Sequence, residues 1–295
     1  MTGETKRYRI THRTTYTYSD DVSSSYGRTH LTPRELPGQR ITDAELIIEP
    51  EPSDRSTSPD VFGNTTAFFH INTDHRTLVV TNVSTAEVDP PDEVRLQRGY
   101  STAPWEDSRP TGVAGALATE FVLDLVPPEI TDAVRDYAAV TFTPGRPLVE
   151  VIRELTTRIF TDFTYKSGST TNSTKVAEVM EARSGVCQDF ARIAIACLRS
   201  QGLAARYVSG YLSTRPPPGK ERMIGVDASH AWAAVWLPDD EWLAFDPTNN
   251  QLADERYITV SWGRDYADVP PLRGIIYTDS KKSTINVSVD VAPLD

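Results

Sequence analysis

The sequence predicts an α+β fold in which a strand-rich N-terminal domain precedes a core of helices and then strands. Three observations predict it. β-branched and aromatic runs fill the first part of the chain, apolar residues recur at helical spacing in the middle, and strand-like patterns return after the helices. Separate runs of strands and helices are typical of α+β proteins. The chain has 295 residues, of which 39% are apolar, so it can bury the cores of two modest domains.

Residues 1–88 are predicted to form an antiparallel β-sandwich-like domain. Dense β-branched and aromatic residues indicate its strands, and residues 60–64 carry a turn signal between two of them. The predicted strands cover residues 8–12, 14–18, 46–48, 67–71 and 78–83. Residues 89–126 begin with many Pro, Asp and Glu residues and are interpreted as a connecting segment packed on the surface.

Residues 127–250 are predicted to form the core, with helices first and an antiparallel sheet after them. Pro127 and Pro128 precede the first helix, where proline is favoured. The predicted helices cover residues 129–140, 147–160, 174–182 and 186–199, and the predicted strands cover 206–212, 231–237 and 242–245.

Residues 251–295 are predicted to form a C-terminal β extension. Strands are expected at residues 257–260 and 274–277. Residues 286–291 alternate between polar and apolar side chains, which indicates an edge strand.

Cys187 is the most informative residue because it stands at the start of the fourth predicted helix. Phe190, Ile193 and Leu198 follow it at helical spacing, and Gly202 is a reasonable stop. In the first turn of a helix, the dipole and the free N–H groups favour an anion. This position therefore favours a reactive thiolate, and the same N–H groups could stabilise an oxyanion on a substrate.

His230 and Asp246 complete a possible triad in the order Cys, His, Asp. His230 is the only histidine in the second half of the chain, so it is the sole candidate base in the same domain as Cys187. Asp246 ends the predicted strand 242–245, next to the strand that begins at His230. In such a triad the thiol attacks, the imidazole takes its proton and the carboxylate fixes the imidazole tautomer.

Three neighbouring residues are interpreted as structural or as weaker candidates. Cys197 shares the apolar face of its helix and is interpreted as a core residue. Asp189 is expected to tie down the helix start rather than to act in chemistry. Asp227 is closer to His230 in sequence than Asp246 is, but a loop Asp three residues away rarely reaches the far ring nitrogen.

Four segments, in this order, resemble the bacterial transglutaminase-like superfamily. They are residues 185–190 (GVCQDF), 205–211 (ARYVSGY), 230–232 (HAW) and 246–249 (DPTN). Residues 8–18, 31–34 and 60–64 resemble the β-rich N-terminal region that accompanies this core in bacteria, and residues 263–271 resemble the tail of the same proteins. The resemblance implies a papain-like transglutaminase core, in which a helix-borne cysteine packs on an antiparallel sheet.

The resemblance also implies roles for individual residues. Cys187 would be the nucleophile, His230 the base and Asp246 the orienting acid. In related cores an aromatic donor upstream of the cysteine helps to hold the oxyanion, which makes Tyr165 a candidate; a half-buried tyrosine at a strand end is the alternative. Gln188 is a second candidate for support of the site.

Trp232 and Tyr211 are candidate substrate-binding residues, with a core position for Trp232 as the alternative. Residues 214–229 are a candidate substrate gate, because their three consecutive prolines cannot form sheet and should stand exposed near the cleft. An ordinary long surface loop is the alternative.

The triad predicts attack of a thiolate on an amide carbonyl and a thioester intermediate on Cys187. Water as the acceptor gives a cysteine peptidase, amidase or deamidase, and an amine gives a protein-glutamine gamma-glutamyltransferase that cross-links proteins. These chemistries share one triad. Because no clustered acidic loop of a calcium site is present, we favour hydrolysis of a peptide, isopeptide or amide bond in a peptide or protein substrate. A non-catalytic scaffold that binds a peptide or protein is the alternative from another class.

Composition limits the partners and the location. The formal net charge of −11 argues against a general nucleic-acid or anionic-membrane partner. A long apolar span and an apolar secretion signal are both missing, and two cysteines give no disulfide framework, so a cytoplasmic, bacterial-type protein is expected. His70 and His75 match no metal spacing, and no phosphate loop is present, so no cofactor or metal is expected. The sequence does not determine the oligomeric state.

Overall fold

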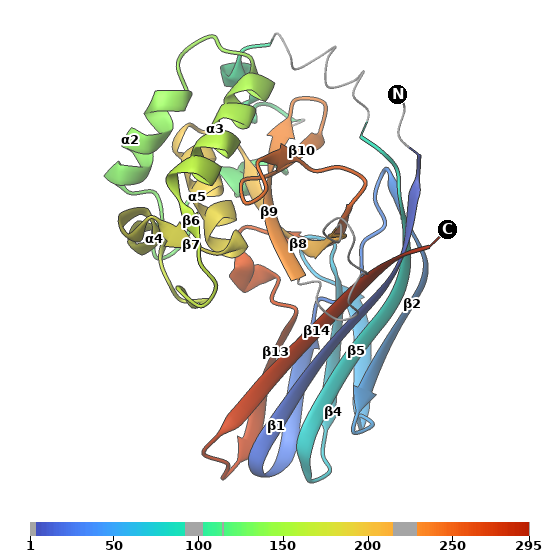
Figure 1. Ribbon diagram of the computed structural model, residues 1–295. Helices are drawn as coiled ribbons and strands as arrows, with labels where there is room; N and C mark the ends of the chain where they lie inside the picture. Colours follow the sequence, from blue (N-terminus) through green and yellow to red (C-terminus); the bar gives the residue numbers. More distant parts are fainter. Residues whose placement is uncertain (1–3, 92–102, 114, 215–228, 295) are drawn as a thin grey trace, which may run out of the picture.

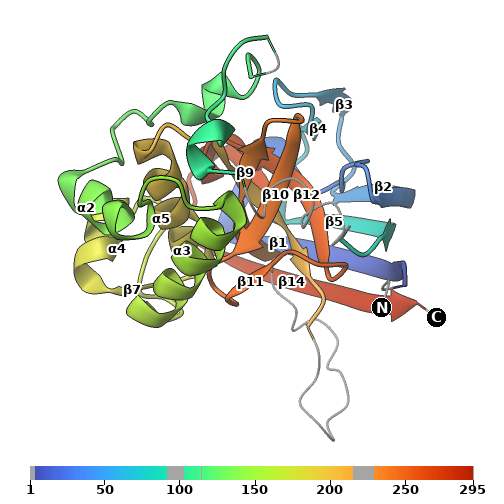
Figure 2. The same cartoon turned by 90° about the horizontal axis from the view of Figure 1, so that it is seen from above.

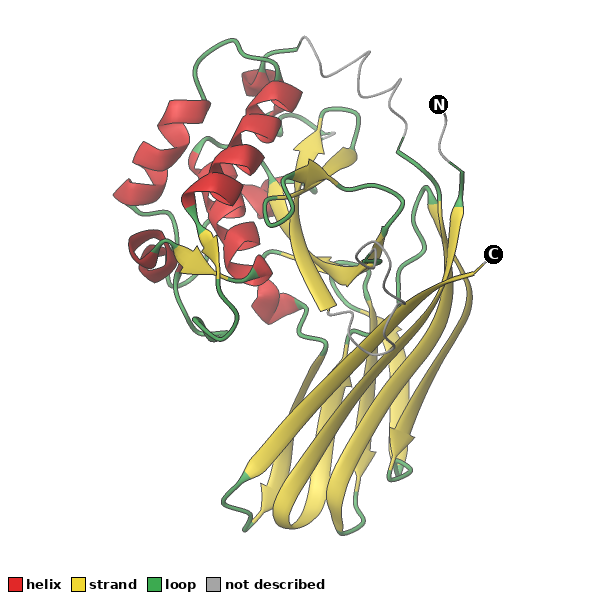
Figure 3. Cartoon of the chain, in the orientation of Figure 1, coloured by secondary structure: helices red, strands yellow, loops and turns green. Residues whose placement is uncertain are grey.

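The computed structural model describes residues 4–91, 103–113, 115–214 and 229–294. A core of helices and short strands lies beside a domain of long strands (Figure 1, Figure 3). The predicted α+β class, with a strand-rich domain formed by the N-terminal part of the chain, is confirmed.

The N-terminal domain is a sandwich of two strand layers joined through one long strand. Its strands are β1 (Lys6–Thr29), β2 (Gln39–Glu49), β3 (Asp54–Pro59), β4 (Thr65–Ile71), β5 (His75–Val88), β13 (Leu272–Thr278) and β14 (Ser283–Leu294). The first half of β1, as far as Thr17 or Tyr18, pairs with β5 and β14; its second half, from Val22, pairs with β13 and, from Ser25, with β4. The two halves of β1 therefore belong to the two layers. The predicted strands at residues 8–12 and 14–18 both lie in its first half and form one continuous strand.

The apolar interior of this domain lies between the layers. Leu78 and Val80 of β5 belong to one buried cluster with Phe69 of β4. Gly27 allows the Phe69 ring to lie directly over β1, because a Cβ atom at Gly27 would come within 2.0 Å of that ring. Burial of these side chains is the main source of stability of the sandwich.

The sequence prediction missed β3. All six of its residues are exposed, so the segment carries no apolar alternation. β3 lies at the edge of the sheet, where charged residues and Pro59 hinder pairing with other chains.

The last strands of the chain complete the sandwich that the first strand begins. β13 and β14 pair with β1, and β4 and β5 pair with its other edge. The described ends of the chain therefore lie side by side, with Arg7 of β1 opposite Leu294 of β14. Within the described residues β14 pairs with β1 alone, as the alternating pattern of residues 286–291 predicts for an edge strand.

The core packs helices on one side of an antiparallel sheet. In the described part of the chain its helices are α2 (Asp132–Thr141), α3 (Leu148–Asp162), α4 (Val176–Ala182) and α5 (Cys187–Ser200). Its sheet consists of β8 (Ala205–Leu212), β9 (Ser229–Leu237), β10 (Glu241–Asp246), β11 (Gln251–Leu252) and β12 (Tyr257–Gly263), in the order β11-β10-β9-β8-β12. Ala233 and Val235 of β9 share the main apolar cluster with Ile193 and Leu198 of α5, so the sheet supports this helix.

α2 begins at Asp132 rather than at the predicted residue 129. The side chain of Thr131 accepts a hydrogen bond from the Val134 N–H and caps the helix. Glu129 turns instead toward α4, where its carboxylate accepts the Val176 N–H at 2.7 Å.

The connecting segment contributes to the interior and does not lie only on the surface. Trp105 is 3% exposed and packs edge-on against Phe142, with ring centroids 5.3 Å apart. Phe121 is also buried and contacts Trp242 of β10. The many polar residues around these aromatic side chains concealed this role.

The sandwich packs against β8 and β12 of the core sheet. Tyr8 and Ile10 of β1 form one buried cluster with Tyr211 of β8 and Ile258 of β12. Figure 2 shows the long strands beside the core sheet, with α2 to α5 on the other side of the molecule. No helix among the described residues is both long and apolar enough to cross a membrane.

Candidate active site

Cys187 is the first residue of α5 and is half-buried. The helix start is fixed by Asp189, whose carboxylate accepts hydrogen bonds from the Val186 N–H at 2.8 Å and the Thr170 hydroxyl at 2.7 Å. Gly185 permits this contact, since a Cβ there would lie 2.8 Å from the Asp189 carboxylate. Asp189 therefore ties down the turn that presents the thiol, as the sequence predicted.

Replacing Asp189 with alanine should destabilise the fold through the helix start. It removes the capping carboxylate and leaves the Val186 N–H and the Thr170 hydroxyl without that acceptor, so we expect a loss of about 2 kcal/mol. Urea unfolding monitored by circular dichroism measures this change. Glu178→Ala is the matched control: it removes an exposed carboxylate that accepts the Lys175 N–H at the start of α4, and it should cost less than Asp189→Ala. Unchanged stability of Asp189→Ala would contradict the capping role.

His230 and Asp246 meet across two adjacent antiparallel strands. His230 lies at the start of β9 and Asp246 at the end of β10. The His230 Nε2 atom lies 2.7 Å from Asp246 Oδ2. This contact directs Nδ1, the other ring nitrogen, away from the carboxylate.

Asp246 is fully buried and held by several donors. Its Oδ2 atom also accepts the Tyr257 hydroxyl at 2.8 Å and the Asn249 side-chain amide at 2.6 Å, and Oδ1 accepts the Thr248 N–H at 2.8 Å. Burial alone would raise the pKa of Asp246, but the hydrogen bond and charge of His230, with the Asn249 and Tyr257 donors, lower it. The carboxylate is therefore ionised and rigidly oriented.

His230 connects this carboxylate to the thiol. Burial would lower the pKa of His230, but hydrogen bonds to Asp246 and Cys187, and the charges of both groups, raise it to about 10. The imidazole therefore favours the protonated form. The structure thus places Asp246 in direct contact with His230, and Cys187 close enough to influence the charge of the imidazole.

Tyr165 lies near Cys187. It ends β6 (Thr164–Tyr165), which pairs with β7 (Ser184–Gly185) so that Tyr165 lies opposite Gly185. Its side chain is 56% exposed, and its ring contacts Phe190 of α5 edge-on. Burial and the neighbouring Cys187 raise the pKa of Tyr165, so its hydroxyl remains a proton donor. Gln188, the second residue of α5, is half-buried.

The two predicted substrate-binding residues lie inside the protein. Trp232 is buried, with its ring 6.0 Å from that of His230 and 5.2 Å from that of Tyr257, so it packs beside the His230 imidazole. Tyr211 is buried against the sandwich, and its hydroxyl lies 3.0 Å from His12 Nδ1. The structure gives no support to substrate binding by Tyr211, because the sandwich covers this end of β8.

Sequence reasoning missed Tyr257 and gave Asn249 no role. Tyr257 is the first residue of β12 and lies outside the motif strands, so no local pattern links it to Asp246. Asn249 is the last residue of the DPTN motif (246–249) and follows Asp246 in the same turn, a signal that could have identified it. Asp227 and nearly all of the predicted gate, residues 215–228, lie outside the described residues.

Cys197 and the N-terminal histidines have other environments. Cys197 is fully buried, and burial raises the pKa of its thiol to about 12, which fits a core residue. His70 stacks on Tyr26, and His75 lies 2.9 Å from the Ser25 hydroxyl. Within the described ranges, no three His, Cys, Asp or Glu side chains gather as a metal site would require.

Comparison with known proteins matches both parts of the chain. Residues 8–87 match the bacterial transglutaminase-like N-terminal region, and residues 135–247 match the transglutaminase-like superfamily. An uncharacterized protein of Mycobacterium tuberculosis (strain ATCC 25618 / H37Rv) is 63% identical over 295 residues, which cover 99% of this chain and 94% of the relative. A protein-glutamine gamma-glutamyltransferase of Pseudomonas aeruginosa is 37% identical over 79 residues, covering 26% of this chain and 12% of that protein.

A solved structure shares the whole fold. It is a "putative cysteine protease" from Cytophaga hutchinsonii, with a TM-score of 0.77 and 20% identity, and the match covers 100% of this chain and 93% of that one. Together with the geometry of the site, the sequence matches support a thiol-dependent, transglutaminase-like activity. The chain belongs to the transglutaminase-like superfamily and carries the bacterial transglutaminase-like N-terminal region before its core.

Proposed function

We propose that this protein cleaves an amide bond of a peptide or protein by thiol acyl transfer, with water as the final acceptor. The observation that carries the proposal is the 2.7 Å contact of His230 Nε2 with Asp246 Oδ2, together with the nearness of Cys187, at the start of α5, which contributes to the raised pKa of His230. A nucleophile, a base and an orienting acid in this geometry are the parts that covalent amide cleavage requires.

Each residue has a defined part in the reaction. The Cys187 thiolate attacks the amide carbonyl, while the free N–H groups in the first turn of α5 and the Tyr165 hydroxyl stabilise the oxyanion. Protonated His230 then gives its proton to the departing amine, which leaves a thioester on Cys187. His230 next removes a proton from water, and the resulting attack on the thioester releases the carboxylic acid. Asp246 holds the imidazole in one tautomer and stabilises its charge throughout.

Exposure of the site favours water as the acceptor. Tyr165 is 56% exposed and Cys187 and Gln188 are only half-buried, so solvent reaches the place where the thioester would form. Transfer to an amine is the second candidate, and the similarity to the Pseudomonas aeruginosa protein-glutamine gamma-glutamyltransferase favours it. Product analysis with a peptide substrate, with and without a primary amine, separates the two outcomes.

The first test is the rate of iodoacetamide alkylation at Cys187 in the wild type and in His230→Ala. An ordinary thiol is largely protonated at pH 6 and is alkylated slowly, whereas a thiol that is already ionised beside an imidazolium is alkylated rapidly at this pH. We expect the wild type to react about 10- to 100-fold faster than the variant at pH 6. Mass spectrometry assigns the label, and buried Cys197 should remain unlabelled in the folded protein.

His70→Ala is the matched control, because it removes a histidine from the sandwich surface and should leave the rate unchanged. Equal, slow labelling of the wild type and His230→Ala would contradict the proposal. It would favour a scaffold that binds peptides or proteins without catalysis.

A further inference from the structure

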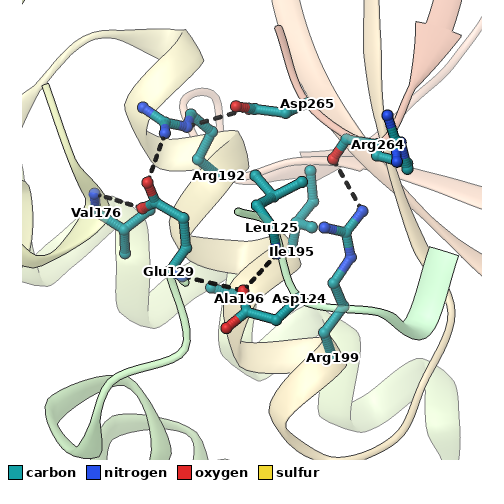
Figure 4. A pocket seen from close by; sticks show the side chains of 10 residues that line it. All are labelled: Asp124, Leu125, Glu129, Val176, Arg192, Ile195, Ala196, Arg199, Arg264 and Asp265. Atoms are coloured by element: carbon teal, nitrogen blue, oxygen red, sulfur yellow. Dashed lines mark hydrogen bonds and ion pairs between the residues drawn. The ribbon is translucent and has the colours of Figure 1, made fainter. Parts of the chain in front are cut away.

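A buried ion triad of Arg192, Glu129 and Asp265 holds α5, the helix that begins with Cys187, in place. Arg192 of α5 is 9% exposed in its side chain and lies 2.9 Å from Glu129 and 3.1 Å from Asp265 (Figure 4). It also donates to the Thr174 carbonyl at 2.6 Å. Arg192 follows Cys187 by less than two helical turns, so a shift of this arginine moves the thiol.

The two carboxylates come from different parts of the chain. Glu129 precedes α2 and caps α4 through the Val176 N–H. Asp265 lies after β12, in the tail segment 263–271. This segment resembles the family but contains none of Cys187, His230 and Asp246. Arg192 therefore fastens α5 both to the helical layer and to the segment that leaves the core sheet.

That segment is in turn fastened to the sandwich. Trp262, near the end of β12, exchanges two backbone hydrogen bonds with the Asn64 side chain, at 2.8 and 2.9 Å. The Arg34 guanidinium lies 3.6 Å from the Trp262 ring centroid and donates to Asn64 at 2.6 Å. Asn64 is fully buried. Residues of three sequence segments that resemble the family, 31–34, 60–64 and 263–271, thus form one connected structure with their neighbour Trp262.

The ion triad permits little movement. Removing one partner of a buried ion pair leaves a charge without compensation, which is strongly unfavourable. Burial raises the pKa of Glu129, and the Val176 N–H and Arg192 oppose this, so the glutamate depends on these contacts to remain ionised. The favourable arrangement is therefore the one in which all three side chains meet.

Tyr207 lies near both Cys187 and the ion triad of Arg192, Glu129 and Asp265. This buried residue of β8 has its pKa raised by burial and then by the charges of Cys187 and Asp265, so its phenol lies within electrostatic range of both. Its ring also contacts Tyr266 of the tail segment edge-on. The tail and the thiol therefore both lie near one buried side chain.

We propose that Asp265 is a positioning residue for Cys187: through Arg192 it sets the placement of α5, and through Trp262 the N-terminal sandwich holds Asp265 in place. The sandwich is then a part of the catalytic machinery and not a separate binding module. This inference rests on the proposed function, since it concerns the pairing of Cys187 with His230.

Asp265→Asn tests the proposal, with the ratio of Cys187 alkylation rates at pH 6 and pH 9 as the readout. At pH 9 an ordinary thiol is mostly ionised, so the ratio reports the pairing with His230 and is insensitive to global stability. We expect the ratio to fall about 10-fold, since small displacements of reacting groups have large effects on rate. Asn64→Ala, on the sandwich, should lower it in the same direction by a smaller factor.

Glu154→Gln is the matched control. Glu154 of α3 forms another ion pair of the helical layer, with Arg146 at 2.7 Å, and also accepts the Thr141 hydroxyl, but no contact links it to Arg192 among the described residues. It should lower the melting temperature and leave the ratio unchanged. Should Asp265→Asn fail to fold, Arg192→Lys replaces it, because lysine keeps the charge and loses the second contact.

The outcomes separate the two proposals. A fast wild type with an unchanged ratio in Asp265→Asn overturns the positioning role and leaves the proposed function intact. A wild type that reacts no faster than His230→Ala overturns the proposed function itself. A low ratio in Asp265→Asn together with a wild-type ratio in Asn64→Ala overturns the role of the sandwich.

Discussion

Asp246→Asn is expected to lower the rate of amide cleavage by about 10³-fold or more while the protein remains folded. Asn has nearly the shape of Asp, and its amide oxygen can still accept the Thr248 N–H; the Tyr257 hydroxyl, which donates to the other oxygen in the wild type, can accept a hydrogen bond from the amide N–H instead. The substitution removes the charge that supports protonated His230 and the acceptor that fixes its tautomer. Thiol alkylation should fall less, because His230 is still present beside Cys187.

The same substitution should change the pH dependence of stability. The pKa of His230 is about 10 in the folded protein and about 6.5 in an unfolded chain. Its contribution to stability is therefore complete below pH 6.5 and is lost as the pH rises through 10. Urea unfolding at pH 6, 8 and 10 should show this decline in the wild type and a weaker decline in Asp246→Asn.

Asn249→Ala is the control for this prediction, since it removes a neutral donor to Asp246 and leaves the charge. We expect it to be much less damaging than Asp246→Asn. Equal losses in the two variants would show that the charge of Asp246 is not the important property.

Gly210→Ala is expected to destabilise the protein by about 3 kcal/mol, the largest effect on stability that we predict. A Cβ atom at this position would come within 2.2 Å of the Ile258 carbonyl oxygen and 2.6 Å of the Trp232 ring. The carbonyl belongs to the neighbouring strand β12 and cannot move without breaking the sheet. Because Gly210 lies opposite His230 in the pairing of β8 with β9, the strain also reaches the base.

Thermal unfolding and urea unfolding measure this loss. Ser209→Ala, at the adjacent buried position of the same strand, is the matched control and should cost less than about 1 kcal/mol. Comparable stability of the two variants would show that the sheet can accept a methyl group at residue 210.

Local patterns were sufficient for the helices and for most strands. The apolar spacing of α3 and α5 identifies both, because a helix that packs on a sheet must bury one face. β3 was missed because it buries no side chain, and the buried position of Trp105 was missed because its neighbours are polar. The domain boundaries and the catalytic roles remain predictions.

The candidate site divides in the same way. Cys187, His230 and Asp246 could be selected from the sequence because a helix start, a lone histidine and a strand end restrict the choice. Tyr211 could not be excluded as a site residue, since its burial depends on His12, which is 199 residues away. Tyr257 could not be identified for a similar reason, because it reaches Asp246 from a strand outside the motifs.

The sequence by itself determined the fold class, the four helices predicted for the core and the order of the three triad residues, because these depend on contacts between neighbours along the chain. Only the tertiary structure decided the division of β1 between two layers, the pairing of β13 and β14 with β1, and the ion pair of Asp265 with Arg192 of α5. Each of these depends on residues that are far apart in sequence, and side-chain periodicity carries no information about which distant segment is the partner.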